Sequence, residues 1–125
     1  MKHILVVEDS STIRKLVASL LKANDITIYE AEDGIEALEL AKKNHIDLMI
    51  SDCLMPEMNG LELARELRKI ERYKKLPILM LTAESGPEMR QEGKDLGLVG
   101  WALKPLNQQM FKHTIERVLN KFESA

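Results

Sequence analysis

The chain has 125 residues, of which 45% are hydrophobic and 30% charged, and its formal net charge is −2. This composition fits one folded domain, and neither a nucleic-acid footprint nor a membrane span is expected from near-neutral charge and short apolar runs. The N-terminus lacks the pattern of a signal peptide and Cys53 is the single cysteine, so we expect a cytoplasmic protein without internal disulfides.

Along the chain, short apolar runs alternate with segments of helical periodicity. Apolar runs of strand length are typical of strands buried on both faces. In chain order the expected elements are a strand at Ile4–Val7, a helix from Ser10 to near Asn24, a strand at Ile26–Tyr29, a helix at Ile35–Lys43, a strand at Leu48–Ile50, a helix at Leu61–Ile70, a strand at Ile78–Leu81, a helix at Pro87–Leu96, a strand at Val99–Leu103 and a helix at Phe111–Phe122. Five strand–helix repeats indicate an α/β fold with a doubly wound, five-stranded parallel sheet, formed by one domain over residues 1–125.

Two of these helices have informative ends or interiors. The first opens with Ser10, a preferred N-cap residue, and its apolar stripe ends near Asn24, a good C-terminal residue. The helix expected over Pro87–Leu96 has few apolar anchors and contains Gly93. We therefore expect it to be marginally stable and mobile.

Ionisable and hydroxyl side chains stand at the carboxyl ends of the expected strands. Glu8 and Asp9 follow the first strand, and the third, fourth and fifth strands end in Asp52, Thr82 and Lys104. Ligands of open parallel sheets bind at this edge, so we expect the five side chains to meet there. Three carboxylates together would repel one another. Lys104 supplies one offsetting charge, and oxygen ligands favour Mg²⁺ for the remainder.

Such a group of residues suits phosphoryl transfer. A carboxylate can attack phosphorus to form an aspartyl phosphate, and the reaction chiefly needs positioning and charge neutralisation. We interpret Asp52 as the phosphoacceptor, with Lys104 and the Thr82 hydroxyl holding phosphoryl oxygens. Each residue taken alone also has an ordinary explanation as a helix cap, a strand former or a solvated strand end. Their meeting at one edge favours the functional interpretation.

Two other functions use related parts. A flavodoxin-like electron carrier would hold the phosphate of FMN in residues 9–12, although the acidic pair there disfavours an anion. A dehalogenase-type phosphatase has an aspartyl nucleophile after its first strand and a second Asp two residues later, where this chain has Ser11. The three histidines, His3, His45 and His113, are far apart in the sequence. We therefore expect no histidine metal cluster that would compete with the carboxylates.

The strings LVVEDS, SDCLMPEMNGLEL, PILMLTAES and GWALKP resemble the receiver domain of two-component response regulators. The resemblance covers essentially the whole chain and is to single-domain receivers. It implies a flavodoxin-like (βα)5 fold with strand order 2-1-3-4-5 and no output domain. It also implies that a sensor histidine kinase phosphorylates Asp52 in the presence of Mg²⁺, and that the chain is a phosphoacceptor rather than an enzyme.

The resemblance further assigns a role to each matching residue of the metal site. By this resemblance, Asp9 occupies the position of a direct Mg²⁺ ligand, and Glu8 that of a residue that binds the ion through water. The backbone carbonyl of Leu54 occupies the position of a third protein ligand. Asp52 completes this set.

Other matching residues resemble the parts of a switch. Thr82 and Lys104 correspond to residues that sense the phosphoryl group, and Trp101 to an aromatic switch residue that is more usually Tyr or Phe. The bond before Pro105 is expected to be cis. Leu54 and Glu84 flank the site where the family tunes loss of the phosphoryl group.

The resemblance also implies partners. They are a sensor histidine kinase, a downstream target such as the flagellar motor switch, and a phosphatase. The length and motifs favour a role in chemotaxis, with a phosphorelay or phosphate-sink receiver as the alternative. We expect a monomer that binds neither nucleic acid nor membrane.

Overall fold

A five-stranded parallel sheet lies at the centre of the molecule. The computed structural model describes residues 2–22, 25–55, 58–83 and 86–123, so Asn24 and Glu84 lie outside the described residues. The strands are β1 (Lys2–Val7), β2 (Ile26–Ala31), β3 (Leu48–Asp52), β4 (Ile78–Thr82) and β5 (Gly100–Leu103). Their order is β2-β1-β3-β4-β5, which confirms the predicted order and the doubly wound α/β class.

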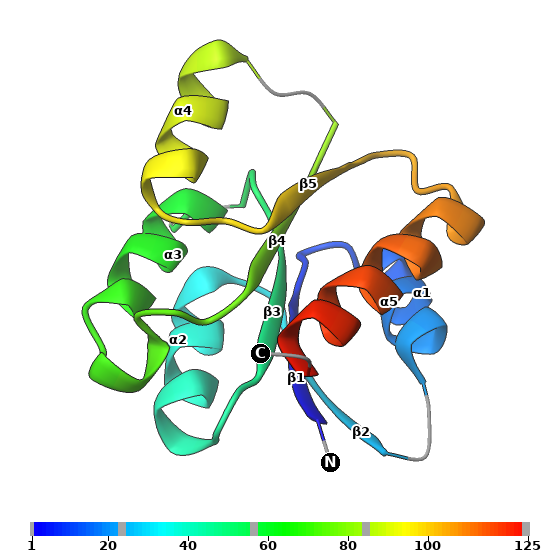
Figure 1. The fold of residues 1–125 in the computed structure, drawn as a ribbon, viewed down its shortest axis with the longest axis horizontal. Coiled ribbons are helices and arrows are strands. Elements are labelled where there is room, and N and C mark those ends of the chain that lie inside the picture. The colour runs from blue at the N-terminus through cyan, green and yellow to red at the C-terminus, as the bar shows by residue number, and fades with distance from the viewer. Residues whose placement is uncertain (1, 23–24, 56–57, 84–85, 124–125) are drawn as a thin grey trace.

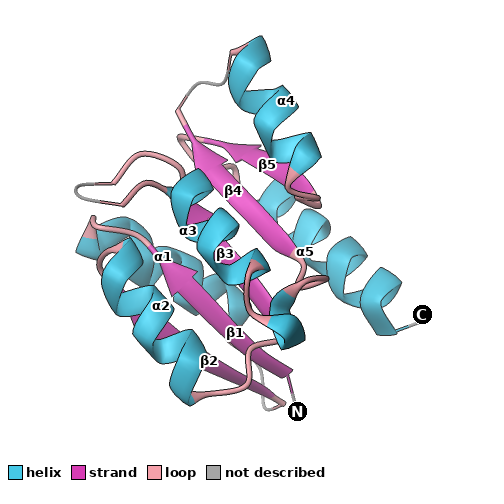
Figure 2. Ribbon diagram, turned by 90° about the vertical axis from the view of Figure 1, so that its left-hand side faces the viewer, coloured by secondary structure: helices cyan, strands magenta, loops and turns pink. Residues whose placement is uncertain are grey.

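Helices cover both faces of this sheet, as Figure 1 and Figure 2 show. One face carries α1 (Ser11–Leu21) and α5 (Gln108–Glu123). The other carries α2 (Gly34–Lys43), α3 (Gly60–Arg68) and α4 (Pro87–Asp95), with a short 3-10 helix, η1 (Glu71–Tyr73), after α3. Within the described ranges, no helix has the length and apolar character that crossing a membrane requires.

The sheet separates two apolar clusters because successive strand residues point to opposite faces. In β1, Leu5 and Val7 pack on the side of α2 and α3, whereas Ile4 and Val6 pack on the side of α1 and α5. Every residue of β3 and β4 is buried. Burial on both faces explains why these strands read as continuous apolar runs.

Side chains cap the N-termini of α1, α2 and α3, each of which follows a strand of the sheet. Ser10 caps α1 by accepting a hydrogen bond from the Ile13 N–H, as predicted, so capping does not occupy Asp9. Asn59 and Glu62 form a reciprocal capping box at the start of α3. The β1–α1 and β2–α2 connections are short, so they keep the carboxyl ends of these strands close to helix N-termini.

The helix α4 is regular, although its sequence pattern was the weakest. Gly93 is its one buried residue. Gly97 follows it with φ of 74°, the left-handed conformation that favours glycine after a helix. Arg68 of α3 donates to the carbonyls of Leu96 and Gly97 at 2.9 and 3.3 Å. Side-chain contacts thus hold the end of α4, and its expected mobility stays a prediction.

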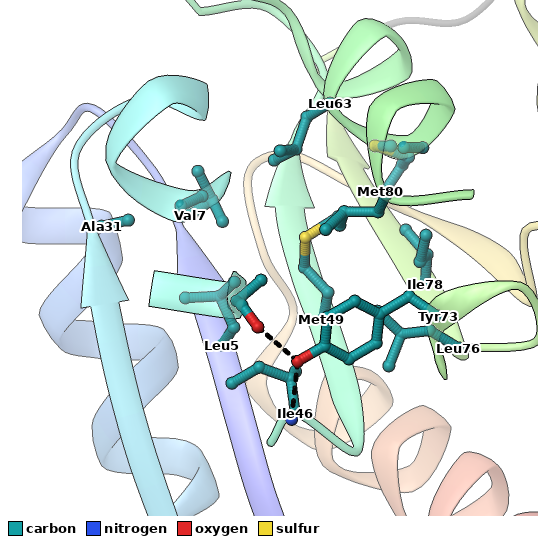
Figure 3. Packing of buried hydrophobic residues seen from close by; sticks show 14 of the residues in the cluster. Leu5, Val7, Ala31, Ile46, Met49, Leu63, Tyr73, Leu76, Ile78 and Met80 are labelled. Atoms are coloured by element: carbon teal, nitrogen blue, oxygen red, sulfur yellow. Dashed lines mark hydrogen bonds between the residues drawn. The ribbon is translucent and has the colours of Figure 1, made fainter. Parts of the chain in front are cut away.

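Tyr73 fastens the end of α2 to the core. Its side chain is fully buried, and its hydroxyl lies 2.6 Å from the carbonyl oxygens of both Ala41 and Asn44. The same hydroxyl accepts a hydrogen bond from the Ile46 N–H at 3.2 Å. Figure 3 shows Tyr73 among the buried residues with its hydroxyl toward Ile46. One side chain therefore provides hydrogen-bond partners for backbone groups in the connection between α2 and β3.

We expect Tyr73→Phe to lower the free energy of unfolding by about 1–3 kcal/mol, because buried backbone groups lose their partner. Urea denaturation followed by circular dichroism measures this. Tyr29→Phe is the control, since the half-buried Tyr29 hydroxyl contacts the Nδ1 atom of the His3 side chain and not buried backbone groups, as far as the described residues show. Equal stability of the two variants would contradict the role given to Tyr73.

Candidate functional site

The site lies at the edge of the sheet formed by the carboxyl ends of the strands. Backbone hydrogen bonds between neighbouring strands continue there for one residue beyond the ends of β1 and β5. The Glu8 N–H donates to the Ala31 carbonyl at 3.0 Å, and the Lys104 N–H donates to the Thr82 carbonyl at 2.8 Å. Asp52 is the last residue of β3, between β1 and β4. The backbone therefore fixes each of these residues relative to its neighbouring strand.

Three carboxylates come together at this edge. Glu8, Asp9 and Asp52 each offer an oxygen, and these oxygens lie within 4.8 Å of one another. Glu8 is 1% exposed and Asp52 6%, whereas Asp9 is exposed. Within the part of the chain that the structure describes, no other three acidic, histidine or cysteine side chains converge so closely.

Lys104 bridges two of these acids. Its Nζ lies 2.9 and 3.2 Å from the two carboxylate oxygens of Glu8, and 3.2 Å from Oδ1 of Asp52. One ammonium leaves two of the three negative charges without compensation. All the donors are hard oxygens, so the residues fit a divalent ion of the Mg²⁺ type.

The pKa values of this group show the same imbalance. Burial raises the pKa of Glu8 to about 7, the hydrogen bond from Lys104 opposes this, and the neighbouring Asp52 reinforces it. Burial alone would lower the pKa of Lys104, but its hydrogen bond to Glu8 and the charges of Asp52 and Glu8 raise it. Lys104 therefore remains an ammonium, yet it does not fully stabilise the Glu8 carboxylate.

Thr82 ends β4 beside this group. Its residue is 1% exposed, and it pairs with Leu103 in the parallel ladder. Asp52 pairs with Leu81 one position earlier. Thr82 therefore lies at the same edge as the carboxylates, on the strand next to that of Asp52.

Gly60 brings the start of α3 against the end of β3, a feature that the sequence interpretation missed. Its N–H donates to the Cys53 carbonyl at 2.8 Å. A Cβ at this position would lie 2.4 Å from the Asp52 carbonyl oxygen. The buried Cys53 has a pKa raised to about 11, by burial and then by the charges of Asp52 and Glu92. Its thiol stays protonated and is not a nucleophile at neutral pH.

Trp101 lies on β5 and packs against α4. It is half-buried, and a Cβ at Gly93 would lie 2.7 Å from its Cζ2 atom. The guanidinium of Arg90 stands over the indole, 5.8 Å from the ring centroid. The absence of a side chain at Gly93 thus makes room for the indole.

The other expected residues lie close to the strand ends. The Lys104–Pro105 peptide bond is cis. Leu54, two residues after Asp52, is 62% exposed. Its expected role as a carbonyl ligand stays a prediction.

Two histidines that are distant in sequence do approach each other. The rings of His3 and His45 have centroids 6.4 Å apart, edge to face. His45 contacts Asp47 at 2.9 Å through Nε2. Sequence separation alone was thus a poor guide to histidine proximity, although these groups do not converge as the carboxylates do.

Comparison with known proteins identifies a family. Residues 4–116 match the family model described as the response regulator receiver domain. The chemotaxis protein CheY of Pseudomonas aeruginosa is 37% identical over 119 residues, covering 94% of this chain and 96% of that protein. CheY-3 of Vibrio cholerae is 35% identical over 119 residues, covering 94% of this chain and 92% of that protein.

Solved structures agree with the fold. Chemotaxis protein CheY4 of Vibrio cholerae has a TM-score of 0.88 and 43% identity, covering 94% of this chain and 98% of its own. The receiver domain of the sensor histidine kinase PA1611 of Pseudomonas aeruginosa, solved with a magnesium ion in its active site cleft, has a TM-score of 0.82 and 25% identity over 99% of this chain and 98% of its own. The family match decides against the flavin-carrier and phosphatase alternatives.

Proposed function

Because the chain belongs to the response regulator receiver domain family and is a phosphoacceptor signalling module, we propose that Asp52 is the residue that receives the phosphoryl group. The observation that carries this assignment is the position of Asp52. It is a nearly buried carboxylate at the end of β3, between Glu8 and the Lys104 ammonium. The exposed Asp9 has neither the burial nor the contact with Lys104.

The reaction on this proposal is transfer from a kinase phosphohistidine. An Asp52 carboxylate oxygen bonds to phosphorus while the P–N bond to the donor imidazole breaks, and the imidazole keeps that electron pair. Lys104, already 3.2 Å from Asp52, neutralises charge on the transferred group, and the Thr82 hydroxyl donates to a phosphoryl oxygen. The chain thus accepts the group stoichiometrically instead of turning over a substrate as an enzyme does.

The carboxylates of Glu8, Asp9 and Asp52, with the Leu54 carbonyl, would hold Mg²⁺. When bound there, Mg²⁺ supplies positive charge that offsets the carboxylates and the phosphoryl oxygens. The oxygen-only donor set and the raised Glu8 pKa support this proposal. The magnesium ion named for the PA1611 receiver domain supports it by analogy.

The proposed output is binding to another protein in a chemotaxis pathway. The named chemotaxis relatives, which this chain matches over more than nine-tenths of their length, support that assignment. A sensor histidine kinase would supply the phosphoryl group, the flagellar motor switch is the proposed target, and a phosphatase would reset the monomer. A phosphorelay or phosphate-sink role would show instead as phosphoryl transfer to a second histidine protein.

The emission of Trp101, the one tryptophan in the chain, tests coupling to this site. Adding beryllofluoride and Mg²⁺ should quench or shift the emission. The reason is that the phosphoryl mimic attracts the Thr82 hydroxyl, which lies on β4, the strand next to β5. Asp52→Asn serves as the control and should give no such change. An unchanged spectrum in a protein that is phosphorylated normally would contradict the switch role of Trp101 and leave Asp52 as phosphoacceptor.

A further inference from the structure

Arg14 of α1 is a largely buried cation next to the acidic pair, and the sequence interpretation gave it no role. Its side chain is 11% exposed. Its Nη1 donates to the backbone carbonyl of Glu8 at 2.7 Å, and its Nε donates to Oε1 of Glu30 at 3.2 Å. The guanidinium therefore links α1, the end of β2 and the segment that carries Glu8 and Asp9.

These contacts fix the backbone of Glu8 at both of its polar groups. The Glu8 N–H donates to the Ala31 carbonyl at 3.0 Å, while its carbonyl accepts from Arg14. The second contact sets the plane of the Glu8–Asp9 peptide. Both carboxylates project from the two residues that this peptide joins, so its orientation limits the directions that they can take.

Asp9 depends most on this restraint. Its side chain is exposed, and within the described residues no hydrogen bond or ion pair holds its carboxylate. Glu8, by contrast, is held through Lys104. The backbone of Asp9 sets the direction of its Cα–Cβ bond, and so the region that its carboxylate can reach before metal binding.

We propose that Arg14 is a positioning residue for the divalent-cation site, which aligns the carboxylates of Glu8 and Asp9 by holding the Glu8 carbonyl, and that Glu30 in turn orients Arg14. This inference rests on the proposed function, since the site it serves is the Mg²⁺ site of Asp52. Outer partners that orient metal ligands commonly change metal affinity by about 10–100-fold when removed.

A positioning role differs from a general effect of positive charge. Lysine keeps the charge of Arg14 but replaces the planar fork by a single ammonium on a flexible chain, which does not reproduce two directed contacts. Arg14→Lys should therefore bind Mg²⁺ nearly as weakly as Arg14→Gln. Glu30→Gln leaves every atom of Arg14 in place and should weaken binding in the same direction by a smaller factor.

The experiment is a titration of the full chain with MgCl₂, in which isothermal titration calorimetry measures the dissociation constant. Arg14→Gln should raise the Mg²⁺ dissociation constant about tenfold. Phosphorylation by a small-molecule phosphodonor gives a second measurement. The Mg²⁺ concentration for half-maximal rate should rise equally, while the rate at saturating Mg²⁺ stays within about twofold of wild type, because Asp52, Thr82 and Lys104 are unchanged.

Lys15→Met is the matched control, since it removes one positive charge from the exposed side of α1 and leaves Glu8 untouched. Its dissociation constant should equal that of the wild type. Wild-type affinity in Arg14→Lys would show that the two directed contacts are not needed, and an equal loss in Lys15→Met would show a general effect of altering α1. Either result would overturn the inference.

Melting curves without Mg²⁺ show whether each variant is folded. The Glu30→Gln result decides the question even where an Arg14 variant does not fold, and wild-type affinity in Glu30→Gln would then overturn the inference. Failure of the wild type to bind Mg²⁺ would contradict the proposed function itself, and is distinguished from the other outcomes by that measurement.

Discussion

Asp52→Asn will abolish phosphorylation by a cognate kinase or by acetyl phosphate, seen as loss of the phosphoryl mass increase in intact-protein mass spectrometry. An amide is not a nucleophile toward phosphorus under these conditions. Asparagine has almost the same shape, and it removes a negative charge that helps to raise the pKa of Glu8. The melting temperature should therefore not fall, so loss of labelling would not reflect unfolding.

Asp95→Asn is the control, because this exposed carboxylate is on α4 and pairs with Gln91. It should be labelled like the wild type. A pull-down with beryllofluoride should then capture a target with the wild type and with Asp95→Asn, but not with Asp52→Asn. Persistent labelling of Asp52→Asn that maps to Asp9 would contradict the assignment.

Gly60→Ala is expected to lower the free energy of unfolding by about 2–3 kcal/mol, at the upper end for overpacking a core. The added Cβ would lie 2.4 Å from the Asp52 carbonyl oxygen, 2.8 Å from the sulfur of Met80 and 3.1 Å from Cα of Cys53. The Met80 side chain can move, but the two backbone atoms belong to Asp52, which ends the buried strand β3, and to Cys53, which follows it. Relief of the clash must therefore displace Asp52, and the phosphorylation rate should fall with stability.

Gly86→Ala makes the matched comparison, since a Cβ there meets nothing within 4 Å. Urea denaturation midpoints of the two variants measure the difference. If Gly60→Ala is as stable as Gly86→Ala, then α3 can withdraw from β3 without cost, and the close approach at Gly60 does not position Asp52.

The strands were predicted to within two residues at each end, and the remaining error has a physical origin. The apolar pattern stops at Ile50 and Leu81, but β3 and β4 continue to Asp52 and Thr82. Backbone hydrogen bonding extends the strands past the last apolar residue, because the residues at their carboxyl ends are polar residues of the candidate site. Prediction from hydrophobicity therefore ends these strands too early.

Helix ends differ for a similar reason. The α5 helix begins at Gln108 instead of Phe111, because its first turn is exposed and carries no apolar stripe. The available signal was Asn107, whose side chain accepts from the Met110 N–H at 3.0 Å. The α3 helix ends at Arg68, although Ile70 still packs against the core. Burial alone thus did not distinguish a helix from the turn after it.

The sequence located the side chains of the candidate site but not their supports. Carboxylates, a hydroxyl and a lysine at strand ends are recognisable because parallel strands deliver them to one edge. Arg14 and Gly60 instead contact backbone atoms. Arg14 donates a hydrogen bond to the Glu8 carbonyl, and the lack of a side chain at Gly60 leaves room for the Asp52 carbonyl. Patterns of residue type report side-chain chemistry, and they carry little information about which backbone atoms approach each other.

The contact between Lys104 and Glu8 joins residues 96 positions apart, from the end of β5 and the end of β1. During synthesis, Glu8 and Asp52 leave the ribosome long before Lys104. Non-local pairing of this kind is slow to form, because the entropy of closing a long loop opposes it. On the assignments made above, a nascent or truncated chain lacks the cation that completes the acceptor. Competence to take a phosphoryl group therefore requires that the four strands from β1 to β5 in the sheet order have assembled.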